Sequence, residues 1–215
     1  MIECNDTTLV IDTGPDFRQQ MLSNRVSKLD AIVFTHEHKD HIAGLDDIRS
    51  YNYKQKFDMP IYGVSRVIDR VRSEFPYIFE VEKYPGVPTV DIHEIDNSPF
   101  HIGKIKLTPI EVMHYKLPVF GYRVLDFAYL TDVKTIEITE KEKLKNLDVL
   151  VINALQIKPH LSHLTLDEAL ELIHELSPKR TYLTHISHYL GLHKEVEKIL
   201  PENVFLAYDG LTLRV

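Results

Sequence analysis

The chain has 215 residues, of which 44% are hydrophobic and 27% are charged, with a formal net charge of −7 at pH 7. This length supports one substantial core, so we expect a single domain over residues 1–215, and the acidic balance argues against a broad surface for nucleic acid. The sequence has no apolar run near the roughly 18 residues of a membrane span and no signal-peptide pattern, and its one cysteine, Cys4, cannot form an internal disulfide; we therefore expect a cytoplasmic protein with no membrane partner.

The first predicted strand covers residues 7–12 and ends on a carboxylate, Asp12. Gly14 then turns the chain, and Pro15 suits the first position of a short helix that continues to Met21. Asp12 has two interpretations that the sequence leaves open. It accepts backbone N–H groups in the turn, or it orients a metal ligand nearby.

A dense set of metal-ligand residues follows the second predicted strand, the apolar run at 31–34. Three histidines and an aspartate lie within six residues: His36, His38, Asp40 and His41. Two histidines spaced two apart reach one ion, whereas Asp40 and His41 must point elsewhere, towards a second ion. Imidazole and carboxylate donors suit zinc, iron or manganese. A single His-x-His would indicate only a solvated loop, but four such residues together predict a metal site.

The remaining periodicity predicts an alternating α/β chain in which ligand-type residues stand at strand ends. Helices are expected at 44–52, 64–75, 166–176 and 193–199, and strands at 60–63, 89–95, 104–112, 127–130, 148–152, 180–184, 204–207 and 211–215. Thr165 and Glu168 form a capping-box pattern at the start of the third helix. The proline-containing stretch 76–103 is expected to be a rim loop with little structure beyond its strand.

Three sequence segments carry a resemblance to a known family. They are I-D-T-G-P-D-F-R-Q-Q at 11–20, T-H-E-H-K-D-H-I-A-G-L-D-D-I-R at 35–49 and L-T-H-I-S-H at 183–188. They resemble the metallo-β-lactamase fold superfamily, and within it the branch of phosphoribosyl cyclic phosphate phosphodiesterases of the carbon–phosphorus lyase pathway. The resemblance implies an α/β fold, an αββα sandwich of two mixed sheets flanked by helices, with an N-terminal hairpin of the relatives missing.

The same resemblance implies a dinuclear centre that holds two divalent ions, zinc or manganese, with iron as a further option. Each residue in the expected ligand set ends or follows a predicted strand: His36, His38 and His114 for one ion, Asp40, His41 and His185 for the other, and Asp132 bridging both. Two divalent ions, two aspartates and a bridging hydroxide leave a local charge of +1, which favours a phosphate anion inside an acidic protein.

The catalytic candidates are Asp40, within the ligand set, and His163, which precedes the capped helix as the active-site histidine of the resembled phosphodiesterases does. An imidazole there stabilises a negative oxygen or protonates the leaving alkoxide. His160 is the competing candidate, and His188 is either an outer partner of the site or a surface residue. Further residues have no metal role or only a speculative one: His93, His101 and His174 as non-ligands, and Arg18, Arg49 and Tyr51 as phosphate contacts or surface residues.

The expected activity is hydrolysis of a small anionic, cyclic phosphodiester by a metal-bridging hydroxide. Processing of transfer RNA 3′ ends is the alternative, although the chain shows no basic arm for RNA and its net charge opposes nucleic acid as a partner. β-Lactam and thioester hydrolysis are weaker alternatives. An alternative that is not an enzyme is a metal-binding module without catalysis. A homodimer is a possible assembly.

Overall fold

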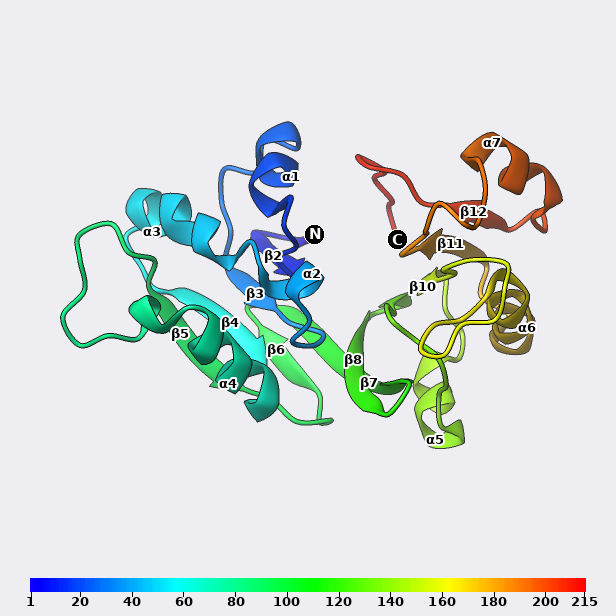
Figure 1. The fold of residues 1–215 in the computed structure, drawn as a ribbon, viewed down its shortest axis with the longest axis horizontal. Helices are drawn as coiled ribbons and strands as arrows, with labels where there is room; N and C mark the ends of the chain where they lie inside the picture. Colours follow the sequence, from blue (N-terminus) through cyan, green and yellow to red (C-terminus); the bar gives the residue numbers. More distant parts are fainter. The chain divides into compact units, whose positions relative to one another are not determined.

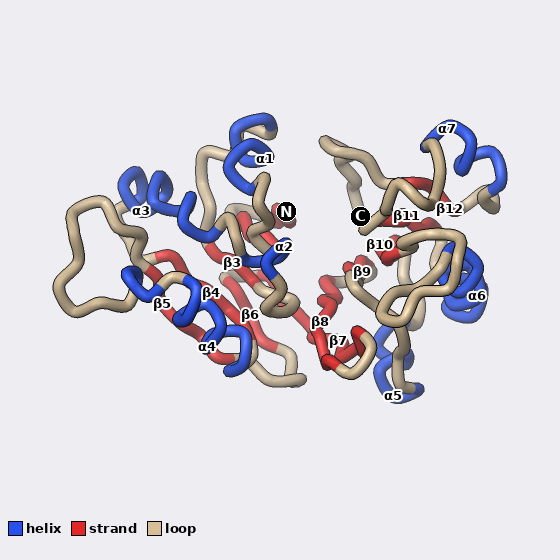
Figure 2. The backbone as a smooth tube through the Cα atoms, viewed as in Figure 1, coloured by secondary structure: helices blue, strands red, loops and turns tan.

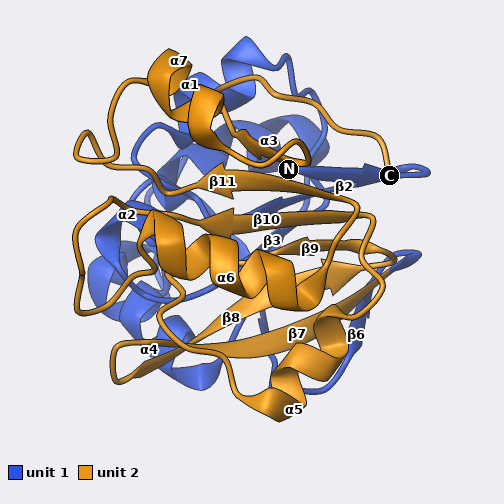
Figure 3. Cartoon of the chain, turned by 90° about the vertical axis from the view of Figure 1, so that its right-hand side faces the viewer, with its two compact units in different colours: residues 1–105 blue, residues 106–215 orange.

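The computed structural model describes residues 1–215, which divide into two compact units, Met1–Ile105 and Lys106–Val215 (Figure 3). Each unit contains a mixed sheet flanked by helices, as the α/β prediction required (Figure 1). A single domain over the whole chain stays a prediction.

The first unit is built on a five-stranded sheet in the order β1-β2-β3-β4-β5. Strand β1 pairs antiparallel with β2, and the other neighbours pair in parallel. The elements of this unit are β1 (Ile2–Cys4), β2 (Thr7–Ile11), α1 (Phe17–Ser23), β3 (Ala31–Val33), α2 (Lys39–Ile42), η1 (Leu45–Ile48), α3 (Arg49–Gln55), β4 (Met59–Gly63), α4 (Ser65–Glu74), η2 (Pro76–Ile78), β5 (Val90–Glu94) and β6 (Phe100–Ile102).

The parallel pairing of β2 with β3 decides where the first unit places its polar residues. Ile11 lies opposite Val33, and the amide of Asp12 donates to the Val33 carbonyl at 2.9 Å. The two strands therefore end together, and their following residues emerge at one edge of the sheet. All three residues of β3 are buried, as expected for a central parallel strand.

The second unit contains a sheet in the order β12-β11-β10-β9-β8-β7, and this order continues with β6, which precedes the unit boundary. Strands β9 to β12 run parallel, while β7, β8 and β9 pair antiparallel. The elements are β7 (Ile105–His114), β8 (Leu117–Val124), β9 (Phe127–Tyr129), α5 (Ile138–Lys141), η3 (Glu142–Leu144), β10 (Val149–Asn153), α6 (Leu166–Leu176), β11 (Arg180–Thr184), α7 (His193–Val196), η4 (Glu197–Ile199) and β12 (Val204–Leu206).

Helix α6 packs an apolar face into the core of the second unit and begins at a complete capping box. Leu166, Ala169 and Ile173 are buried, whereas Leu170 and Leu176 are partly buried against the same core. Thr165 accepts from the Glu168 amide at 3.2 Å, and the Glu168 carboxylate accepts from the Thr165 amide at 2.8 Å. The predicted start of this helix is confirmed. At 11 residues it is the longest helix, and no helix has the length and hydropathy of a bilayer span.

The structure differs from the predicted elements in several places (Figure 2). The strand predicted at 211–215 is wrong, because those residues pair with no strand and β12 is the edge of its sheet. Strand β8 was not predicted. It follows β7 through a two-residue turn at Tyr115 and Lys116, and Tyr115 adopts the left-handed conformation with a φ of 59°. Strands β1 and β6 are only three residues long and leave no periodic signal.

Candidate metal centre

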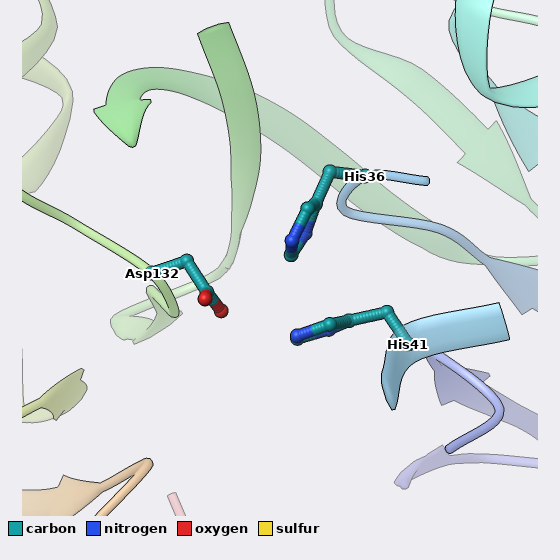
Figure 4. A group of neighbouring side chains, drawn as sticks. All are labelled: His36, His41 and Asp132. Atoms are coloured by element: carbon teal, nitrogen blue, oxygen red, sulfur yellow. The ribbon is translucent and has the colours of Figure 1, made fainter. Parts of the chain in front are cut away.

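The first unit gathers the histidine-rich segment at the end of β3. His36 is fully buried, and its Nε2 lies 3.0 Å from Nδ1 of His38. The rings of His36 and His41 lie with their centroids 4.0 Å apart (Figure 4). The 3.0 Å between Nε2 of His36 and Nδ1 of His38 is close to the distance between two nitrogen ligands of one zinc ion. Zn–N bond lengths and tetrahedral angles put that distance at about 3.3 Å.

Asp12 and Thr35 hold these histidines from behind. Asp12 Oδ1 accepts the Thr35 amide at 2.8 Å, and Oδ2 accepts the Thr35 hydroxyl at 2.7 Å. The same Oδ2 lies 2.7 Å from His41 Nδ1, and the Thr35 hydroxyl lies 3.0 Å from His36 Nδ1. The carboxylate of Asp12 thereby fixes Nδ1 as the donor of His41 directly and of His36 through Thr35. Of the two readings of Asp12, the geometry supports the orientation of histidines in addition to backbone bonding.

Asp40 and His41 form a second pair on helix α2. Asp40 Oδ2 lies 3.4 Å from His41 Nε2, and the Asp40 side chain is 61% exposed. With His41 Nδ1 held by Asp12, its Nε2 side faces Asp40. Within the first unit, His36 therefore lies beside both His38 and His41, and Asp40 lies beside His41. The division of these residues between two ions stays a prediction.

Two glycines let the turn after β2 lie directly against this segment. A Cβ on Gly44 would stand 2.3 Å from the Gly14 carbonyl oxygen and 2.7 Å from Phe17 Cβ, and a Cβ on Gly14 would stand 2.8 Å from the Asp40 carbonyl oxygen. Thr13 sits between them, since its amide donates to the His41 carbonyl at 2.7 Å and its carbonyl accepts the Gly44 amide at 2.8 Å. Close backbone approach thus fixes the geometry of α2.

The second unit gathers its own cluster around the buried carboxylate of Asp132, which follows β9. The Thr131 hydroxyl donates to Asp132 Oδ2 at 2.7 Å, and Nε2 of His163 lies 2.9 Å from Oδ1. Nε2 of His185, after β11, lies 3.4 Å from the same oxygen. His114, Asp132 and His163 are all buried, and their ligand atoms are close enough together to hold one ion.

His114 ends β7 with its tautomer fixed by backbone carbonyls. Its Nδ1 lies 3.1 Å from the carbonyl oxygen of Asp132 and 3.0 Å from that of Ser162. Two carbonyls accept only, so Nδ1 is the donor and Nε2 carries the lone pair. That is the form in which imidazole binds a metal.

Three residues of these clusters adopt the left-handed backbone conformation. The φ angles are 61° at Asp12, 58° at Asp132 and 52° at His185. Each follows a parallel strand, and the conformation is one that aspartate and histidine adopt more readily than β-branched residues. Beside Asp132, the buried side chain of Asn153 accepts from the Val133 amide at 2.7 Å and donates to its carbonyl at 3.1 Å. Asn153 therefore holds the backbone next to Asp132.

His163 lies with His160 and Ser162 just before helix α6. Nδ1 of His163 lies 3.0 Å from the Ser162 hydroxyl and 3.1 Å from Nδ1 of His160. Burial, followed by the neighbouring His163 and the charge of Lys134, lowers the pKa of His160 below the ordinary histidine value. The structure thus places His163 beside Asp132 and places its competitor His160 behind it.

Other candidates from the sequence are engaged elsewhere or lie at the surface. The Tyr51 hydroxyl donates to the Val26 carbonyl at 2.9 Å, and Arg49 pairs with Asp46. His93 pairs with Asp91 at 2.8 Å. The other predicted non-ligands and speculative contacts are exposed: Arg18, His101, His174 and His188.

Sequence reasoning missed four supporting residues, namely Thr35, Thr131, Asn153 and Ser162. Asn153 ends the buried run Val149–Asn153, so the rule that polar residues at strand ends line the site would have found it. The others carry no signal of their own beyond standing next to a predicted ligand or catalytic histidine.

The donor sets fit divalent metal ions. Neutral imidazoles with Nδ1 engaged by carboxylate, hydroxyl or carbonyl groups, and carboxylates that accept further hydrogen bonds, match the outer-partner pattern of protein metal sites. The set contains no thiolate, so it favours ions that accept nitrogen and oxygen donors.

Comparisons with known proteins identify the family and the fold. The family described as "Beta-lactamase superfamily domain" matches residues 7–186. A crystal structure of a "new diphosphatase from the PhnP family" is 38% identical, with a TM-score of 0.91 over 99% of this chain and 82% of that one. The metallo-β-lactamase fold protein YhfI of Bacillus subtilis, 20% identical with a TM-score of 0.77 over 97% of this chain and 87% of that one, shares the fold.

A curated octanoyltransferase of Porphyromonas gingivalis is 38% identical over 205 residues, which are 94% of this chain and 41% of that protein. The chain therefore spans less than half of that relative.

Two mixed sheets flanked by helices, with histidine and aspartate clusters at their strand ends, define the class of metallo-β-lactamase-fold proteins. The chain belongs to the beta-lactamase superfamily, and its identity to the diphosphatase across nearly its whole length places it with the PhnP family. The resemblance inferred from the three sequence segments is confirmed.

Proposed function

We propose that the chain is a metal-dependent phosphodiesterase that hydrolyses a small anionic phosphodiester. The observation that carries the proposal is the pair of histidine and aspartate clusters in which His41 Nδ1 is held by Asp12 and His114 Nδ1 by two carbonyls. Such fixed tautomers are typical of metal ligands. The 38% identical PhnP-family diphosphatase supports chemistry at a phosphorus atom.

In this proposal the seven strand-end residues hold two divalent ions, as the superfamily resemblance implies. His36, His38 and His114 would hold one ion, Asp40, His41 and His185 would hold the other, and Asp132 would be shared by both. When bound, the ions supply Lewis acidity for the phosphate oxygens and a water with a lowered pKa. Zinc and manganese fit the nitrogen and oxygen donors, and iron is a further option.

The protein's own residues orient the centre and handle the proton. Asp12 and Thr35 hold His41 and His36 with Nδ1 as the donor, and Thr131 holds one oxygen of Asp132. His163 presents Nε2 towards Asp132 Oδ1 at 2.9 Å, so Nε2 faces the candidate metal ligands. In this proposal Nε2 is the atom from which a proton passes to the leaving oxygen.

Hydrolysis of a diphosphate bridge is the second candidate, because the diphosphatase relative carries that activity in its name. A disubstituted diphosphate has a reacting phosphorus with two bridging oxygens, as a diester has, but its leaving group is a phosphate, which departs with less help from an acid. The two candidates therefore share the metal ligands and differ in how much they depend on His163.

The test is hydrolysis of three probes by the purified chain with manganese or zinc, and again after chelation. The probes are bis(4-nitrophenyl) phosphate, a dinucleoside diphosphate and 4-nitrophenyl phosphate. We expect metal-dependent turnover of the first, little turnover of the monoester, and loss of activity in Asp132→Ala. Cleavage confined to the dinucleoside diphosphate would select the second candidate.

Two outcomes would reject both candidates. Metal-dependent cleavage of a transfer RNA precursor without turnover of the small probes would establish the alternative nuclease. Metal bound by the wild type and lost in Asp132→Ala, without turnover of any probe, would indicate a metal-binding module without catalysis.

A further inference from the structure

The segment before helix α6 contains two histidines whose ring nitrogens face each other. Nδ1 of His163 and Nδ1 of His160 are 3.1 Å apart, a separation at which one nitrogen donates and the other accepts. The direction of this bond decides which nitrogen of His163 carries its fixed proton.

A backbone donor settles the direction. The Ser162 amide donates to His160 Nδ1 at 3.3 Å, so that nitrogen presents its lone pair. Nε2 of His163 donates to the carboxylate oxygen Oδ1 of Asp132 at 2.9 Å, so in the doubly protonated form that a proton donor requires, Nδ1 donates as well. Its acceptor is either His160 directly or the Ser162 hydroxyl, which lies 3.0 Å from His163 Nδ1 and 3.4 Å from His160 Nδ1. In both arrangements the proton sits on Nδ1 of His163, and His160 is the final acceptor.

We propose that His160 is the positioning residue for His163: by accepting the Nδ1 proton it holds the ring so that Nε2 is the nitrogen that exchanges a proton with the leaving group. This inference rests on the proposed function for the role of His163. The ring of His163 contacts the flanking residues His114 and His185 at centroid distances of 4.5 and 4.9 Å, and His160 contacts His163 on its Nδ1 side.

The local fold supports such a role. Leu164 donates to the Val133 carbonyl at 2.8 Å, and its own carbonyl accepts the Leu155 amide at 3.0 Å, so the backbone beside His163 is tied to the second unit on both sides. The backbone therefore places His163, and the remaining freedom is rotation of its ring. An acceptor at Nδ1 removes that freedom, as second partners of catalytic histidines do in other enzymes.

The test compares His160→Leu, which removes the acceptor, with His160→Asn, whose side-chain oxygen reaches the place of Nδ1. His174→Leu, an exposed histidine on α6, is the matched control. Rates are measured on methyl aryl phosphates whose phenols span a range of pKa values. General acids contribute about 10²- to 10⁴-fold, so we expect His160→Leu to lower kcat by roughly tenfold or more for phenol and about threefold or less for 4-nitrophenol.

The inference further predicts an unchanged KM and metal content in His160→Leu, recovery of most activity in His160→Asn, and no additional loss when His160→Leu is combined with His163→Ala. A loss that is equal for all leaving groups, or absent, overturns it, because a merely structural residue would act in that way.

A nuclear magnetic resonance measurement separates this inference from the proposed function. The hydrogen-bonded Nδ1 proton of His163, assigned by its loss in His163→Ala, is expected in the wild type and in His160→Asn but not in His160→Leu. If no phosphodiester is hydrolysed, the proposed function fails and this signal alone decides the pairing. Persistence of the signal in His160→Leu overturns the inference whatever the activity.

Discussion

At the scale of single residues, the candidate centre depends on its histidines and also on the side chains that hold them from behind. The Thr35 hydroxyl links Asp12 to His36, and the link is buried, with Thr35 only 1% exposed. The threonine hydroxyl donates to the aspartate and accepts from the histidine, so it connects the two side chains directly.

Replacing Thr35 by valine is expected to lower metal affinity by about 10- to 100-fold, the cost of removing a hydrogen-bonding partner of a ligand. The shape of the side chain is kept, so the fold should persist, while His36 Nδ1 and one oxygen of Asp12 lose a partner. Metal content after dialysis against graded chelator measures the effect. Thr35→Ser, which retains the hydroxyl, is the control, and equal metal content in both variants would contradict the role of this hydroxyl.

Residue patterns identified the candidate ligands because each one stands next to a buried strand in the sequence. They did not identify how the tautomers are fixed, since the carbonyls of Asp132 and Ser162 that hold His114 come from positions 18 and 48 residues away. A backbone carbonyl has no residue type, so no sequence pattern records it.

At the scale of elements, the turn after β2 and the short helix α2 depend on two glycines. A methyl group on Gly44 would overlap the Gly14 carbonyl oxygen and the Cβ of Phe17. Neither atom is the end of a flexible side chain that could move aside. Gly44→Ala is expected to lower the free energy of unfolding by about 1–3 kcal/mol, the usual cost of overpacking, and to lower metal content as well. Urea denaturation measures the change in the free energy of unfolding. Ala43→Ser, at the exposed neighbouring position, should leave both quantities unchanged.

Helix α6 offers a prediction with a pH dependence. Burial raises the pKa of Glu168, but hydrogen bonds from Lys134 and Thr165 outweigh burial and hold its pKa below the ordinary value. A lowered carboxyl pKa stabilises the fold above the unfolded-state pKa, and this contribution disappears as the pH falls through the folded-state pKa.

Glu168→Gln keeps the acceptor for the Thr165 amide and removes only the charge. We expect it to be less stable than the wild type at pH 7 by at most about 1 kcal/mol, as suits a partly exposed pair with Lys134. The difference should vanish in acid, below the pKa range of glutamate. Chemical denaturation of both proteins at pH 7 and at acid pH measures it, and a difference that persists in acid would show another cause.

Elements with a strong period were predicted well, and those defined by pairing were not. The helix at Leu166–Leu176 and the strands at Val149–Asn153 and Arg180–Thr184 follow their patterns closely. Strand β8 was missed because its run L-P-V-F-G-Y-R-V contains a proline and a glycine. Gly121 is needed there because a Cβ would stand 2.7 Å from the backbone carbonyl oxygen of Tyr129.

At the scale of the whole molecule, the proposed ions should stabilise the folded chain by mass action. A ligand present at 100 times its dissociation constant adds about 2.7 kcal/mol. Chelation is therefore expected to lower the midpoint of thermal unfolding by several degrees, and addition of zinc or manganese should restore it. Asp132→Asn keeps the size of the side chain and should remove most of the shift. Identical midpoints with and without metal would contradict the proposed centre.

The left-handed backbone at Asp12, Asp132 and His185 also limits how this protein can drift in evolution. Few side chains tolerate that conformation, and asparagine and glycine are among those that do. A descendant released from selection for metal binding would lose its carboxylates and imidazole at these three positions, yet its strand ends would still demand the same backbone. Such a lineage should therefore accumulate asparagine and glycine there, and valine and isoleucine should stay rare. The residue types at these three positions would then still indicate where the metal site had been.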